Sequence, residues 1–158
     1  MKTAKKMFNV FQPNVLYLTA TMGKIWGKIV NFSDKLPGAL GYNKQEFNYV
    51  THIKDIMPTS IATIHDEIIR CMMTQGNDAI VNNLRQIFLK NKSNILIRVN
   101  VFIALNLYYT EELPFGVFVT PIETISGFLF ITSQGNVEGV DQGLLNQVNY
   151  WKYLSIFF

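Results

Sequence analysis

The sequence predicts an α+β protein whose helices lie on one face of an antiparallel sheet. Two β-branched and aromatic segments come first, short helical segments and one long helix follow, and three strand-like segments come last. Helices and strands that are segregated along the chain in this way are typical of α+β domains. With 158 residues, 49% hydrophobic and 16% charged, the chain is long and apolar enough to form one domain with its own core.

The first two predicted strands form an antiparallel hairpin. Residues 15–21 and 28–32 are rich in β-branched and aromatic side chains, and Gly23 and Gly27 bracket the turn between them. Residues 1–14 precede the hairpin and are expected to form an N-terminal tail.

Short helices should connect the hairpin to the long helix. Ser33 or Asp34 is placed to cap the first of them and Gly41 to stop it, because these residue types favour helix ends. The three expected segments run to Leu40, over 43–47 and over 53–57.

The long helix is expected to start after Pro58, with Thr59 or Ser60 as its cap, and to end near Gly76. Apolar side chains recur along it at three- and four-residue spacing, and His65 falls among them. We predict that this apolar face lines a pocket between the helix and the sheet; its members are Ile61, Ile64, Ile68 and Met72.

The second half of the chain is strand-rich. Residues 80–90 and 95–101 are predicted strands joined by a turn at 91–94, and Leu113 to Gly116 are expected to separate them from a strand at 117–120. Residues 126–158 form a C-terminal extension, either a hairpin with a flanking helix or the start of a second, similar unit. Its apolar end predicts a partner surface or a continuation of the polypeptide.

Composition excludes several classes of function. One cysteine and two histidines do not make a Cys/His zinc site, and a net charge of +3 without an Arg-rich helix argues against nucleic-acid binding. The sequence has no phosphate-binding loop, nucleophile elbow or metalloprotease motif, and the neighbouring carboxylates Asp66 and Glu67 diverge on a helix. We therefore expect no enzymatic activity. The single cysteine, Cys71, cannot form an intramolecular disulfide, which indicates a reducing compartment and an intracellular protein, either cytoplasmic or at the cytoplasmic face of a membrane.

The order of these motifs resembles that of a PAS domain over residues 15–125. The elements that carry the resemblance are the first hairpin, Leu40-Gly41-Tyr42, Met57-Pro58 before the long helix, and Asn91-Lys92-Ser93 at the later turn. The chain is particularly similar to the PAS modules of large protist membrane proteins of the tiny-macrocysts type. The resemblance implies a five-stranded antiparallel sheet with short helices and one long helix on one face, and a regulatory or protein-interaction role within a larger assembly.

A sharper resemblance concerns His65. Met57-Pro58 followed by His65-Asp66 is similar to the long helix of heme oxygen-sensing PAS domains, in which the matching histidine ligates iron and an arginine matching Arg85 responds to the bound gas. This resemblance implies a heme site at His65. The alternative from the residues alone is a buried histidine that anchors its helix by a hydrogen bond, with no cofactor bound.

Three functions therefore remain open at this point: a PAS-type regulatory module without a cofactor, a heme sensor, and a structural subunit of a complex that binds no ligand. Protein partners or a second copy are expected to bind through the outer sheet face and the C-terminal extension, and contact with a membrane is expected only through a parent protein or complex. The candidate residues for an exposed aromatic patch on that face are Phe102, Leu105, Tyr108, Phe118 and Phe128.

Overall fold

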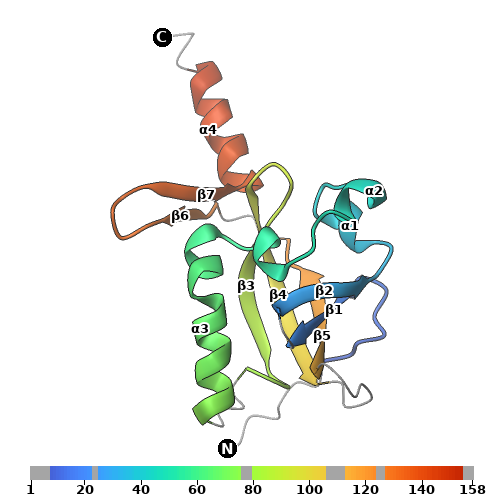
Figure 1. The fold of residues 1–158 in the computed structure, drawn as a ribbon. Helices are drawn as coiled ribbons and strands as arrows, with labels where there is room; N and C mark the ends of the chain where they lie inside the picture. The colour runs from blue at the N-terminus through green and yellow to red at the C-terminus, as the bar shows by residue number, and fades with distance from the viewer. Residues whose placement is uncertain (1–7, 23–24, 76–79, 106–112, 124–126, 155–158) are drawn as a thin grey trace, which may run out of the picture.

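The computed structural model describes residues 8–22, 25–75, 80–105, 113–123 and 127–154, with backbone only for 149–154. These residues form one mixed seven-stranded sheet, four α-helices and a 3-10 helix (Figure 1). The α+β class predicted from the sequence is confirmed.

Five strands form an antiparallel unit in the spatial order β2-β1-β5-β4-β3. Apolar side chains on one face of this unit are in register across it: Leu18 lies opposite Val117, which lies opposite Ile103. The bounds of the strands are β1 Leu16–Met22, β2 Trp26–Phe32, β3 Leu84–Lys90, β4 Ile95–Leu105 and β5 Leu113–Pro121.

The short helices and the sheet share one core. Leu36, Phe47 and Ile56 come from the three short helices, and all three belong to the buried cluster that includes Leu18 and Val99 of the sheet. Burial of these apolar side chains is the main stabilising contribution to the fold. The helices are α1 Leu36–Ala39, α2 Lys44–Phe47 and η1 Ile53–Ile56.

Side chains cap two of these short helices locally. Asn43 accepts a hydrogen bond from the backbone N–H of Glu46, whose carboxylate accepts one from the N–H of Asn43, so α2 begins with a reciprocal capping box. At the start of η1, His52 Nδ1 accepts a hydrogen bond from the backbone N–H of Lys54, and the Asp55 carboxylate accepts one from the N–H of His52. His52 is therefore a helix cap rather than part of a ligand site.

The long helix α3 covers Thr59–Gln75, close to its predicted limits. It lies beside β3 and over the core-bearing face of the sheet (Figure 1). The turn predicted at 91–94 is also present, and Asn94 supplies its left-handed residue with φ of 59°.

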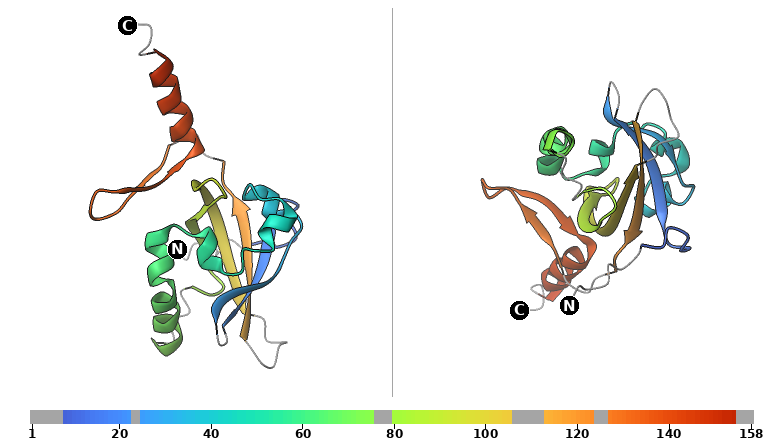
Figure 2. Two further views of the ribbon diagram at one scale, coloured as in Figure 1. Left: turned by 45° about the horizontal axis from the view of Figure 1, so that its top comes forward. Right: turned by 90° about the horizontal axis from the view of Figure 1, so that it is seen from below.

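The predicted five-stranded sheet is wrong in its strand count, because the C-terminal extension contributes two more strands. Strands β6 Leu129–Ile131 and β7 Val137–Asp141 form a hairpin, and β7 pairs in parallel with the first residues of β4. Helix α4, Gln142–Leu154, then projects away from the sheet, while the hairpin reaches toward the start of α3 (Figure 2).

Leu113 to Gly116 do not separate two strands, as the sequence suggested, but form the first part of β5. Pro114 lies within this strand, where it pairs with Thr21 of β1. Gly116 leaves room for the Phe118 ring, which would lie 3.2 Å from a Cβ at residue 116.

Candidate functional site

An apolar cleft lies between α3 and the sheet. It consists of two adjoining cavities, one of about 50 Å³ on the β1–β2 side and one of about 330 Å³ on the β3 side. His65, Ile69 and Ile103 line both. The larger cavity lies at the low end of the range of about 300–1,000 Å³ that is typical of small-molecule sites.

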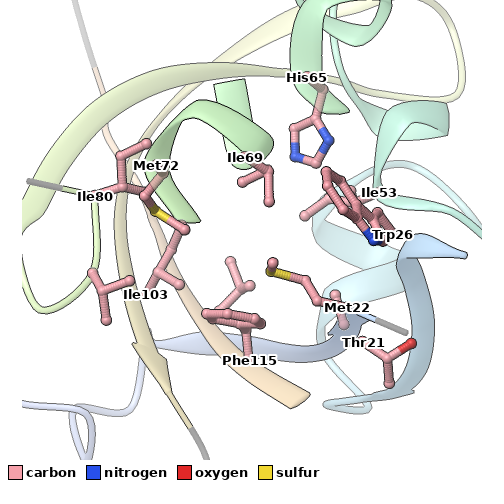
Figure 3. Close-up of a pocket in the computed structure, with 14 residues that line it drawn as sticks. Thr21, Met22, Trp26, Ile53, His65, Ile69, Met72, Ile80, Ile103 and Phe115 are labelled. Atoms are coloured by element: carbon pink, nitrogen blue, oxygen red, sulfur yellow. The ribbon is translucent and has the colours of Figure 1, made fainter. Parts of the chain in front are cut away.

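The His65 ring projects from α3 into the smaller cavity, near Trp26 and Ile69 (Figure 3). Its side chain is only 14% exposed, and this burial lowers the pKa of the imidazole because the charged form loses its hydration. The neighbouring carboxylate of Asp66 favours the charged form but does not compensate for burial. His65 is therefore neutral at pH 7.

Asp66 determines which nitrogen of His65 carries the proton. Its Oδ1 lies 3.3 Å from His65 Nδ1, and its Oδ2 accepts a hydrogen bond of 2.5 Å from Lys54 Nζ in η1. Partial burial raises the pKa of Asp66, but the hydrogen bonds from Lys54 and His65 outweigh it and hold that pKa below its usual value. Because a carboxylate only accepts, we assign the proton to Nδ1, which leaves Nε2 as an acceptor.

The structure brings most of the predicted site residues to this cleft. Ile61 and Ile68 line the larger cavity together with His65 and, from β3, Arg85, whereas Met72 lines the smaller one. Ile64 is the exception. It lines neither of these two cavities and is 50% exposed.

Sequence reasoning missed the parts of the cleft that come from other elements. Trp26 of β2, Ile103 of β4 and Phe130 of β6 all line it, yet none stands near α3 in sequence. Alternation along β4 places Ile103 on the same face as Val101 and was a usable signal. No local signal predicts Phe130 at the cleft, because its position there depends on how the β6–β7 hairpin packs against the rest of the protein.

The outer face of the sheet is not an open aromatic patch. Phe102 stacks on Phe8 from the N-terminal segment at 5.3 Å, and Phe128 packs against Phe88 at 5.4 Å and under the Arg98 guanidinium at 5.0 Å. Segments from both ends of the chain therefore cover part of the face that we predicted to be exposed.

The other members of the predicted patch are divided. Phe118 is half-buried and lies beside Phe102, with ring centroids 6.4 Å apart. Leu105 is 38% exposed, but alternation along β4 places it on the opposite face from Phe102. Tyr108 lies outside the described residues.

Comparison with protein-family models finds no match for this chain, and comparison with curated proteins finds no significant relative. In the part of the chain that the structure covers, no helix is both long and apolar enough to cross a membrane.

Proposed function

We propose that this protein is a PAS-type regulatory module without enzymatic activity, and that it senses a small apolar molecule in the cleft between α3 and the sheet. The observation that carries this proposal is the cleft itself. Its larger cavity of about 330 Å³ is walled mainly by aliphatic side chains and contains one buried, neutral histidine. Such a site favours an apolar ligand that offers a hydrogen-bond donor to His65 Nε2.

The arrangement of residues 16–121 supports the PAS assignment. Five neighbouring antiparallel strands carry the short helices and the long helix on one face, as the sequence resemblance implies. The β6–β7 hairpin and α4 extend this unit at its C-terminal end. Through these elements a structural change caused by ligand binding would reach the rest of a larger assembly.

A pair of matched substitutions on α3 tests the proposal. Ile69→Phe adds bulk to a side chain that lines both cavities, whereas Ile64→Phe makes the same change on the same helix at a residue outside them. The probe is 1-anilinonaphthalene-8-sulfonate, whose fluorescence rises in apolar sites. We expect Ile69→Phe to weaken binding by at least tenfold and Ile64→Phe to leave it within about twofold, a factor of ten being about 1.4 kcal/mol.

Equal binding by both variants and the wild type would show that the probe does not enter the cleft, and the proposed sensing site would be wrong. Thermal unfolding of both variants provides the control, since a variant that has lost its fold would show a broad transition or none.

A heme sensor is the second candidate, and one observation favours it: His65 and Arg85, the two residues implied by the resemblance, line the same cavity. The neutral imidazole leaves Nε2 as the atom that would ligate iron, and the contact between Nδ1 and Asp66 is the kind of interaction that orients a ligating histidine. The iron would supply gas binding, with Arg85 as a donor. The cavity is small for a porphyrin, so α3 would have to move outward to admit one.

The absorption spectrum after heme addition decides between these candidates. A Soret band that is present in the wild type and lost in His65→Ala would establish the heme sensor. A wild-type spectrum that shows only unbound heme would remove this candidate and leave the cleft to a smaller apolar ligand.

A further inference from the structure

Strand β3 has an open edge. It pairs with β4 on one side, and within the described residues no strand pairs with its other side. The N–H of Asn91 donates to the carbonyl of Ile95 at the adjoining turn, which sets the alternation of the antiparallel ladder. By this alternation Ile87 bonds to β4, whereas the backbone groups of Gln86 and Phe88 point toward the open edge.

The apolar stripe of α3 continues beyond this edge. Ile61, Ile64 and Ile68 are between 36% and 50% exposed, although they are large aliphatic side chains on a packed helix. Ile61 and Ile68 share their cavity with residues of β3, whereas the opposite side of α3 faces η1 through the bond from Lys54 to Asp66. The exposed stripe therefore lies on the β3 side of the helix.

These two features have complementary requirements. The open edge needs an extended backbone, because only a strand presents donors and acceptors at the spacing of Gln86 and Phe88. The helix stripe needs apolar side chains at every second position of that strand, since alternate side chains point to one face. One additional strand at the β3 edge would cover the exposed apolar side chains of α3.

We infer that the β3 edge is a docking site for an extended peptide segment of a partner protein, apolar at alternate positions. The backbone of this segment pairs with Gln86 and Phe88, and its inward side chains pack on Ile61, Ile64 and Ile68. Phe130 of the hairpin lies 6.3 Å from Phe88 and limits the paired length at that end. This inference rests on the proposed function in one respect, because it names the kind of partner that the proposed regulatory module binds.

Fluorescence anisotropy tests the backbone pairing with a labelled peptide that alternates valine and threonine between lysine-containing ends. The matched control is the same peptide N-methylated at the amides that face β3, which keeps its apolarity and removes its donors. We expect the unmodified peptide to bind the full chain and the methylated one to bind at least tenfold more weakly. Equal binding of the two, or no binding of the unmodified peptide at about 1 mM, would overturn the inference.

Three variants of the protein test the same contact with the unmodified peptide. Gln86→Pro and Gln86→Ala both lose the hydrogen bond between Gln86 and Arg98, but only the proline variant loses the outward N–H, and proline is tolerated on an edge strand. We expect the peptide to bind the alanine variant like the wild type and the proline variant at least tenfold more weakly. Ile64→Lys, at a half-exposed position, should reduce binding by a similar factor while the melting temperature changes little.

The docking site shares Ile61, Ile68, Gln86 and Phe88 with the larger cavity, so the two proposals are separated by their variants rather than by their locations. Peptide binding that fails while the fluorescent probe remains sensitive to Ile69→Phe would refute strand docking alone. Peptide binding sensitive to Gln86→Pro, together with a probe that ignores Ile69→Phe, would refute the sensing cleft alone.

Discussion

The burial of His65 predicts a specific pH dependence of stability. Burial holds the pKa of His65 in the folded protein below its value of 6.5 in the unfolded chain, so the unfolded state binds more protons between these two values. The free energy of unfolding should therefore be highest above pH 6.5, fall as the pH drops toward the folded pKa, and then level off. Replacing His65 by leucine removes this contribution.

One proton sets the size of the effect. A single titrating group changes the free energy of unfolding by at most about 1.4 kcal/mol per pH unit. At pH 7.5 the leucine variant loses the hydrogen bond to Asp66, which is worth about 0.5–1.5 kcal/mol, but gains a buried apolar side chain in its place. We therefore expect the two proteins to be within about 1 kcal/mol of each other at pH 7.5 and the variant to gain relative stability toward pH 5.

Urea unfolding at pH 7.5, 6.5, 5.8 and 5.0 measures this difference, the pH values being chosen around the unfolded pKa of 6.5. Asp66 does not interfere, because its folded pKa is lowered and its stabilising contribution is lost only as the pH falls below its unfolded value of 3.8. If the free energies of unfolding of the wild type and His65→Leu changed with pH in parallel, the assignment of His65 as a buried, neutral residue would be refuted.

Three further substitutions test the fold around the cleft by urea unfolding. Phe47→Ala empties a fully buried site and should lower the free energy of unfolding by about 3–5 kcal/mol; a loss below 1 kcal/mol would contradict the packing. Gly27→Ala should cost about 1–2 kcal/mol, because φ is +81° and the new Cβ would lie 2.8 Å from Ile53; an unchanged midpoint would contradict this. Glu138→Gln should cost about 0.5–1 kcal/mol, since Glu138 accepts the Ser60 N–H at the α3 N-terminus, and the loss should shrink in high salt.

Local signals were sufficient to predict the long helix and the turn at 91–94. Pro58 followed by Thr59 gave the start of α3, and the polar run at 91–94 gave the turn before β4. The α+β class followed from the order of these elements. In each case the residues that determine the structure are neighbours in sequence.

Features set by distant contacts were predicted less well. The parallel pairing of Val140 with Ile95 joins residues far apart in the chain, so the attachment of the C-terminal hairpin to the sheet was not foreseen. Periodicity correctly placed Ile64 on the apolar side of α3. It does not show that the sheet ends at β3, which leaves Ile64 half-exposed. The same limit applies to the outer face, where Phe8 and Phe128 cover residues that were expected to be exposed.

The most direct test of the sensing cleft is an NMR titration of the isotope-labelled protein with indole, a small apolar probe with one N–H donor. We expect the resonances of His65, Ile69 and Ile103 to shift in a saturable manner, while those of Phe102 and Phe118 on the outer face do not. Saturable shifts confined to the outer face, or none around His65, would contradict this expectation.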